Sequence, residues 1–213
     1  TTKCSTDQVK YDGYCYTTFP SITSQIKEYT EAGVVITGIF YGSPVWGRRK
    51  CNYAIFPEFC APTDEATEDF GRFVGFIAWY FNGENGNGRV ADFVIHNEIN
   101  SAQWFDYGCT VGTCNADIWT TVYANNYNIA YDYVKKEQMN ARVLFSFDSR
   151  FGCDFDIFIN QDPPFFSGET FLSLVIPKVK GRNWNIAFHA YPTSNIFGPN
   201  DYPNITFGNI GIL

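Results

Sequence analysis

The chain has 213 residues, of which 45% are hydrophobic and 19% are Phe, Tyr or Trp. This length and composition predict one large or two small packed domains and exclude a globally disordered chain. The formal net charge of −7 argues against nucleic acid as a partner, because binding to a phosphate backbone requires clustered lysine and arginine. No apolar run reaches the roughly 18 residues of a membrane span, so no membrane-spanning segment is expected.

Seven cysteines form three closely spaced pairs and one single residue, Cys153. The pairs are Cys4 with Cys15, Cys51 with Cys60, and Cys109 with Cys114. No pair has CxxC spacing and the chain has only two histidines, so we predict three disulfide-closed loops, with no metal and no cofactor. These disulfides and the glycosylation sequon at Asn204 predict an extracellular or secreted protein. The start at Thr1 and the lack of a signal peptide indicate a processed chain or a fragment.

The N-terminal residues carry signals for a hairpin, a helix and a strand. Residues 9–18 alternate around Asp12-Gly13, which predicts a β-hairpin in region 1–20 because both turn positions favour positive φ. A helix is expected from Pro20 to Gly33, and residues 34–40 (VVITGIF) predict a buried strand. The apolar face of this helix is expected to comprise Ile22, Ile26 and Tyr29.

A loop over residues 41–62 separates this strand from a second helix, which Thr63 is expected to cap. Turn residues over 82–88 then lead to a strand at 90–97. The apolar face of the second helix is expected to comprise Phe70, Phe73, Val74, Ile77, Tyr80 and Phe81.

The remaining elements repeat the alternation. Asn115 can cap a third helix, residues 142–148 (RVLFSFD) predict a strand, a fourth helix is expected over 168–180, and the last strand is expected at 185–192. The apolar face of the third helix is expected to comprise Ile118, Val122, Ile129, Tyr133 and Val134.

Apolar strands roughly 50 residues apart, with helices between them, predict an α/β fold with a parallel sheet. No Gly-rich phosphate loop follows any strand, so a (β/α)8 barrel is favoured over an open doubly wound sheet. Polar or aromatic groups instead follow the strands, at the rim where barrel enzymes place their chemistry. These groups are Tyr41, Asn97-Glu98, Asp148 with Arg150, and His189 with Tyr191.

Two of these motifs resemble those of a known clan. Asn97-Glu98 after one strand and His189-x-Tyr191 two strands later resemble the retaining glycoside hydrolases with a (β/α)8 barrel, where Asn-Glu ends the fourth strand and His-x-Tyr the sixth. A closer similarity is to the uncharacterised DUF5722 family of glycosidase-like barrels. It is carried by the segments YDGYCY, GRVADFVIHNEINSAQWFDYG, NARVLFSFDSRFG, IAFHAYP and PNITFGNIGIL, which cover nearly the whole chain.

The resemblance implies a role for each rim residue. Glu98 would be the acid/base of a retaining O-glycosidase, and Asn97 would hydrogen-bond the sugar 2-hydroxyl. His189 and Tyr191 would line the cleft, and Asp148 could bind substrate hydroxyls. Trp46 and Trp104 lie in predicted loops at the same rim and are candidate platforms for sugar rings.

Alternatives remain for each of these residues. Glu98 could be a salt-bridge or loop-capping residue, and His189 a satisfied rim histidine. Tyr191 could simply cover the barrel mouth, and Asp148 could pair with Arg150.

The same resemblance predicts an incomplete barrel. With Glu98 on strand four, residues 1–213 form a single partial domain with strands three to six, and the nucleophilic glutamate of strand seven lies beyond the chain. Open barrel edges then predict association with other chains.

Three functions remain: a secreted retaining glycosidase, a catalytically silent barrel that binds a glycan or protein, and, with little support from the cysteine spacing, a redox or metal protein.

Overall fold

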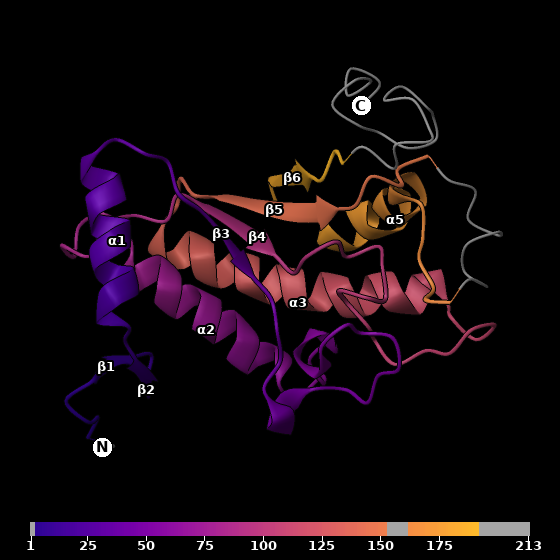
Figure 1. Cartoon of the computed structure of the whole chain (residues 1–213), viewed down its shortest axis with the longest axis horizontal. Coiled ribbons are helices and arrows are strands. Elements are labelled where there is room, and N and C mark those ends of the chain that lie inside the picture. Colours follow the sequence, from indigo (N-terminus) through magenta and orange to yellow (C-terminus); the bar gives the residue numbers. More distant parts are fainter. Residues whose placement is uncertain (1–2, 153–161, 192–213) are drawn as a thin grey trace.

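The computed structural model describes residues 3–152 and 162–191, which form an α/β fold around a four-stranded parallel sheet. The strands are β3 (Thr37–Phe40), β4 (Asp92–Ile95), β5 (Arg142–Phe147) and β6 (Trp184–Phe188), and their order in the sheet is β3-β4-β5-β6 (Figure 1). Spatial order follows chain order, as in a segment of a (β/α)8 barrel. The predicted fold class, an α/β sheet consistent with a partial barrel, is therefore confirmed.

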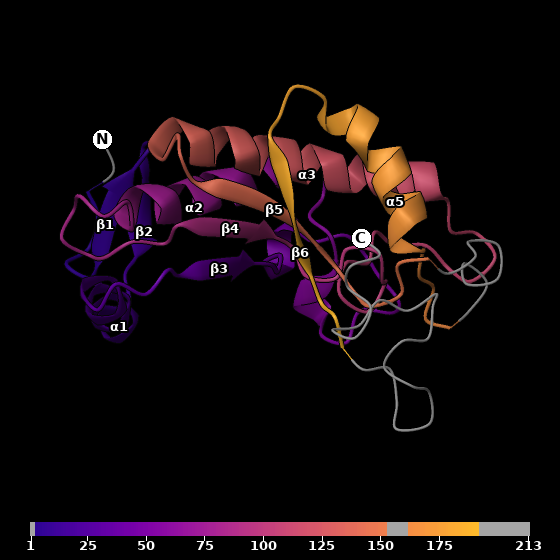
Figure 2. The ribbon, with the colours of Figure 1, turned by 90° about the horizontal axis from the view of Figure 1, so that it is seen from above.

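Helices connect the strands and lie on the same side of the sheet (Figure 2). They are α2 (Thr67–Tyr80), α3 (Ala116–Glu137) and α5 (Gly168–Val175), the last continued by the 3-10 helix η3 (Ile176–Val179). Two further 3-10 helices, η1 (Val45–Gly47) and η2 (Pro57–Phe59), lie in the loop after β3. No helix in the described part of the chain is long and apolar enough to cross a membrane.

Helix α3 holds the carboxyl ends of the central strands through buried aromatic side chains. Trp119 Nε1 donates to the carbonyl of Ile99 at 3.0 Å, and the Tyr123 hydroxyl donates to that of Ile95 at 3.1 Å. Burial raises the pKa of Tyr123, so this phenol stays protonated as a donor. The face predicted for this helix was partly wrong, because Ile118 is exposed and the aromatic residues form the buried stripe. That stripe comprises Trp119, Tyr123, Tyr127, Ala130 and Val134.

Small residues let α2 and α3 approach each other closely. A Cβ atom at Gly71 would lie 2.4 Å from Cγ2 of Ile129, and one at Gly75 would lie 2.9 Å from Tyr133. Helix α2 begins at Thr67 rather than at the predicted cap, because Thr63 instead closes a preceding turn by accepting from the Ala66 N–H.

The N-terminal elements are less buried than the sequence predicts. Helix α1 (Pro20–Glu31) forms as expected but has no buried residue. The buried strand expected over 34–40 is wrong, since β3 begins at Thr37, Val34 and Val35 are exposed, and burial alternates along the strand. The reason is that β3 has a partner on one side only, β4, in the described sheet.

The predicted hairpin and disulfides are confirmed. Strands β1 (Gln8–Tyr11) and β2 (Tyr14–Thr17) pair around Asp12-Gly13, and the Tyr16 ring stacks on Phe76 of α2 at 4.4 Å between centroids. Cysteine pairs 4–15, 51–60 and 109–114 are bonded. The single cysteine, Cys153, and the glycosylation sequon at Asn204 lie outside the described residues.

Candidate functional site

The carboxyl ends of the four strands meet at one edge of the sheet, and the segment after β4 is the most constrained of them. His96 and Glu98 have φ angles of 60° and 39°, a left-handed conformation that is rare for residues other than glycine. Such backbone strain persists only where surrounding contacts impose it, and it is concentrated at functional sites. This makes the segment from His96 to Asn100 the first candidate for a site.

Neighbouring strands impose this conformation. The His96 N–H donates to the carbonyl of Phe40 at the end of β3, at 2.8 Å. On the other side, the Glu98 N–H donates to Ser146 Oγ on β5 at 3.1 Å, and the Ile99 N–H donates to the Ser146 carbonyl at 2.9 Å. The backbone of the segment is therefore fixed from both sides of β4.

Glu98 lies beside His189, which follows β6. Its Oε1 is 2.8 Å from His189 Nδ1, and both side chains are largely buried. The structure thus joins two residues that the sequence places at separate strand ends. No described residue forms a hydrogen bond with the other carboxylate oxygen, Oε2, which leaves this oxygen available to a ligand.

Four carboxylates are buried in the described chain, and Glu98 differs from the other three. Both oxygens of Asp92 bind Arg142. Asp106 accepts three backbone N–H groups at 2.7 Å each, from residues 52, 53 and 108. Asp148 binds Arg150 and the Asn100 amide. A buried carboxylate ordinarily has all its acceptors occupied, and among these four only Glu98 keeps an oxygen that no described residue binds.

The neighbouring amide is also free. Asn97 is buried, and none of its side-chain atoms bonds to a described residue. Tyr191 is exposed, with its ring 5.5 Å from that of His189. Asn97 and Glu98 therefore offer an amide and a carboxylate with unused hydrogen-bonding capacity at the same turn.

Asp148 fits the structural alternative. One oxygen accepts from the Arg150 side chain at 2.5 Å, and the other accepts from Asn100 Nδ2 at 2.9 Å. Asn100 is fully buried and also donates to the carbonyl of Phe166 at 3.0 Å. Asn100 thus ties the loops after β4 and β5 to the segment before α5, and both oxygens of Asp148 are used by Asn100 and Arg150.

His96, the other histidine of the chain, belongs to the core. Its ring stacks on Phe70 at 4.6 Å and contacts Phe105 at 4.6 Å between centroids. Burial lowers the pKa of His96 to about 3, against a smaller opposing effect of the Asn126 amide. The imidazole is therefore neutral at ordinary pH and does not serve as a proton carrier.

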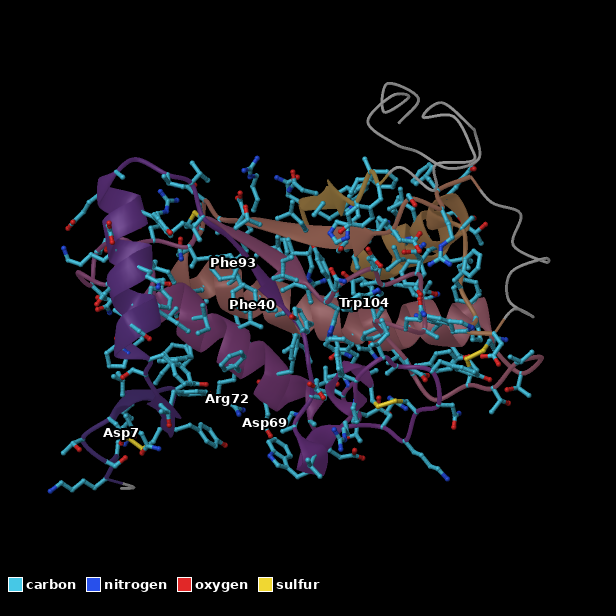
Figure 3. All side chains as sticks on the ribbon, viewed as in Figure 1. Asp7, Phe40, Asp69, Arg72, Phe93 and Trp104 are labelled. Carbon is cyan, nitrogen blue, oxygen red and sulfur yellow. A yellow bond between two sulfur atoms is a disulfide. The ribbon has the colours of Figure 1, made fainter. Side chains whose placement is uncertain are left out.

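The structure separates the two candidate tryptophans. Trp104 packs on Phe59 at 5.0 Å, and Phe59 in turn contacts Tyr41, which directly follows β3. Figure 3 shows Trp104 beyond the end of the strand that carries Phe93. These aromatic rings therefore lie over loops at the same edge as Glu98.

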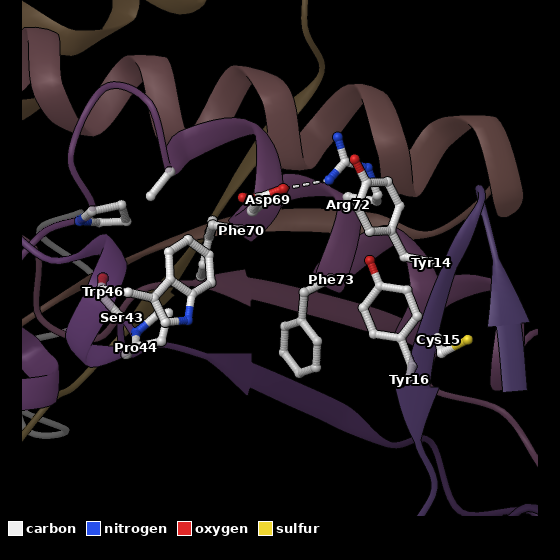
Figure 4. A pocket seen from close by; sticks show the side chains of 13 residues that line it. Tyr14, Cys15, Tyr16, Ser43, Pro44, Trp46, Asp69, Phe70, Arg72 and Phe73 are labelled. Carbon is white, nitrogen blue, oxygen red and sulfur yellow. Dashed lines mark hydrogen bonds and ion pairs between the residues drawn. The ribbon is translucent and has the colours of Figure 1, made fainter. Parts of the chain in front are cut away.

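Trp46, by contrast, is 70% exposed and lines a cavity of about 480 Å³ between the hairpin, α2 and the loop after β3. Figure 4 shows Trp46 on one side of this cavity, Tyr14 and Tyr16 on the other, and the Asp69–Arg72 ion pair above. Neither Glu98 nor Trp104 lines it. The two candidate sugar platforms therefore have different surroundings, since Trp46 lines this cavity and Trp104 packs on Phe59.

Sequence reasoning missed Ser146. This residue is fully buried on β5, and it contacts both Glu98 and His189. The available signal was a hydroxyl in the otherwise apolar run VLFSF. Among the described residues, no group of His, Cys, Asp and Glu could hold a metal ion.

Fold and site together define a barrel-type α/β protein with one buried carboxylate, Glu98, that keeps a free oxygen at the carboxyl edge of the described sheet. The model of a family of unknown function (DUF5722) matches residues 7–206, and the chain belongs to this family. No curated protein matches the chain.

A solved structure to which the chain is similar is that of a sugar phosphate isomerase/epimerase from Parabacteroides distasonis. Sequence identity is 16% and the TM-score is 0.41. The match covers 82% of this chain and 49% of that protein, so the chain spans about half its length.

Proposed function

We propose that the protein is a carbohydrate-active retaining O-glycoside hydrolase in which Glu98 is the acid/base. The observation that carries this proposal is the free Oε2 of a buried carboxylate whose other oxygen is held by His189 at 2.8 Å. Retaining glycosidases require such a carboxyl group, positioned by its neighbours yet open to the glycosidic oxygen. The resemblance of Asn97-Glu98 and His189-x-Tyr191 to the retaining clan supports the same assignment.

The chemistry divides between this chain's groups and a second carboxylate. Glu98 gives its proton to the glycosidic oxygen while the bond from that oxygen to the anomeric carbon breaks and the second carboxylate bonds to this carbon. Glu98, now a carboxylate, then takes a proton from the water that displaces the second carboxylate. Asn97 would bond the sugar 2-hydroxyl, and Tyr191 and Trp104 would contact the sugar ring.

The second carboxylate is proposed to come from outside the described residues. The other buried carboxylates, Asp92, Asp106 and Asp148, already have both oxygens occupied, so none is free to attack. We also propose that the open edge of β3 pairs with further strands of the barrel or with another chain, because Val34, Val35 and Ile39 are exposed there. The three disulfides support an extracellular location.

The alternative is a catalytically inactive barrel that binds glycan or serves a structural role outside the cell. The cavity beside Trp46 supports it, because exposed aromatic rings in a mostly apolar cavity are suited to stacking on a sugar. In that case Glu98 is a hydrogen-bond acceptor for a sugar hydroxyl, and Asp148 a residue that holds the rim in shape.

The test is turnover by the natural protein and its Glu98→Gln variant. Substrates are a panel of dinitrophenyl glycosides and the matching oligosaccharides, which differ in their need for proton assistance. We expect Glu98→Gln to lower oligosaccharide turnover by about 10²–10⁴-fold while dinitrophenyl glycosides still react in the first step. Glu58→Gln, which changes an exposed glutamate in η2, is the matched control.

Unchanged oligosaccharide turnover in Glu98→Gln would refute the acid/base role. An unmutated protein that hydrolyses no member of the panel, yet binds an oligosaccharide in calorimetry, would establish the binding alternative.

A further inference from the structure

We infer that Ser146 is a positioning residue that fixes the tautomer of His189 and thereby decides which oxygen of Glu98 carries the transferable proton. The inference about catalysis rests on the proposed function, whereas the tautomer itself does not. It starts from three groups on three neighbouring segments: Glu98 after β4, Ser146 on β5 and His189 after β6.

The Ser146 hydroxyl has few possible partners. The side chain is fully buried, so water does not reach it. Its oxygen accepts the backbone N–H of Glu98 at 3.1 Å and lies 3.4 Å from His189 Nε2. Within the described residues, Nε2 is the only acceptor within hydrogen-bonding distance of this hydroxyl.

A buried hydroxyl must place its proton on an acceptor, because an unsatisfied buried donor is costly. The Glu98 N–H can only donate, so the proton of Ser146 points to Nε2, and Nε2 must be the unprotonated nitrogen of a neutral ring. The ring proton is then on Nδ1, where it donates to Glu98 Oε1 at 2.8 Å. At 3.4 Å this contact is longer than the 2.8 Å contact between Nδ1 and Oε1.

This arrangement assigns distinct roles to the two carboxylate oxygens. Oε1 accepts from Nδ1–H in either charge state of Glu98, so the carboxyl proton, when present, is on Oε2. Oε2 is the oxygen without a described partner, which is where a glycosidic oxygen would have to approach. After proton transfer, the Nδ1–H donor stabilises the new carboxylate without needing to move.

The same three groups also match the order of a serine hydrolase relay, in which a hydroxyl contacts one imidazole nitrogen and a carboxylate the other. Burial decides between the two arrangements. Of the two groups that contact His189, the Ser146 hydroxyl is fully buried, whereas the Glu98 carboxylate has a free oxygen. Ser146 therefore serves Glu98 through His189 and is not a nucleophile.

Nitrogen-15 NMR of histidine-labelled protein reads the tautomer directly. The chain has only two histidines, and a His189→Gln variant assigns the signals. In the unmutated protein at pH 8, we expect His189 protonated on Nδ1 and not on Nε2. His96 signals should stay constant in all variants, which reports an intact core.

Glu98→Gln separates the effect of Ser146 from the pull of the carboxylate, because a glutamine amide can present either its oxygen or its NH2 group to Nδ1. We expect Glu98→Gln to keep the Nδ1–H tautomer, and Glu98→Gln with Ser146→Ala to convert at least half of the rings to Nε2–H. Glu98→Gln with Ser146→Thr, which retains a hydroxyl, should behave like Glu98→Gln alone.

Three results would overturn the inference. They are an Nε2–H ring in the unmutated protein, identical tautomers with and without Ser146 in the Glu98→Gln background, or covalent labelling of Ser146 by a fluorophosphonate. None of these readouts requires turnover, so failure of the glycosidase proposal leaves the tautomer result standing.

Discussion

The segment after β4 carries two buried carboxylates, Glu98 and Asp106, whose hydrogen-bonding environments are opposite. Asp106 is enclosed by backbone N–H groups of residues 52, 53 and 108 at 2.7 Å each. Glu98 has one partner, His189 Nδ1, and a free oxygen on a strained backbone. The difference indicates that Asp106 stabilises the loop, whereas Glu98 keeps one oxygen open, as the proposed acid/base role requires.

The largest effect on stability is expected at Asp106. Asp106→Ala leaves three backbone donors without their acceptor, and hydrogen bonds to charged groups are worth about 1.5–3 kcal/mol each. We therefore expect the free energy of unfolding to fall by about 3 kcal/mol or more, measured by urea denaturation. Asp64→Ala, which removes an exposed partner of Arg49, should cost less than about 1 kcal/mol. Equal losses of unfolding free energy in the two variants would show that Asp106 is not a stabilising carboxylate.

The buried His96 should make the free energy of unfolding sensitive to acid. Its folded pKa of about 3 lies below the ordinary value of 6.5, so the unfolded chain binds more protons between these limits. Stability from this residue is fully present above pH 6.5 and is lost as pH falls toward 3, by up to about 1.4 kcal/mol per pH unit.

Urea denaturation at pH 7.5 and at pH 5 measures this effect. The unmutated protein should lose about 2 kcal/mol more than His96→Phe over this interval, because phenylalanine does not titrate. Parallel losses in the two proteins would show that His96 is charged or exposed in the folded state.

A smaller effect on stability is expected at Glu98. Glu98→Gln replaces a carboxyl group, whose only described side-chain partner is His189, by an amide of similar shape. We expect the free energy of unfolding to change by less than about 1 kcal/mol in either direction, with turnover reduced as described above. A loss as large as that of Asp106→Ala would place Glu98 among the structural carboxylates.

The smallest effect is expected at Asn97, whose side chain bonds to no described residue. Asn97→Ala should alter the free energy of unfolding by less than about 0.5 kcal/mol and should lower oligosaccharide turnover at least 10-fold, because the bond to the sugar 2-hydroxyl strengthens in the transition state. Asn100→Ala is the contrasting control. It removes a buried amide that binds Asp148 and the Phe166 carbonyl, so it should destabilise the fold measurably.

Local signals determined the elements that depend on a few adjacent residues. Asp12-Gly13 predicted the hairpin, and Asn115 predicted the start of α3, where its side chain accepts from the Ile118 N–H at 3.0 Å. Closely spaced cysteines predicted all three disulfides. Because parallel strands end at one edge, the sequence also predicted that Glu98 and His189 share a rim.

Only the tertiary structure decided which side chains at the rim contact each other and which have all their hydrogen-bond acceptors occupied. Oε1 of Glu98 and Nδ1 of His189 come from residues 91 positions apart, and their 2.8 Å contact depends on the register of three strands. The same register makes Ser146 a contact of both residues, while Arg150 and Asn100 occupy Asp148. Spacing in the sequence specifies where strands end. It does not specify side-chain partners, because these partners depend on the register of neighbouring strands and on packing across the sheet.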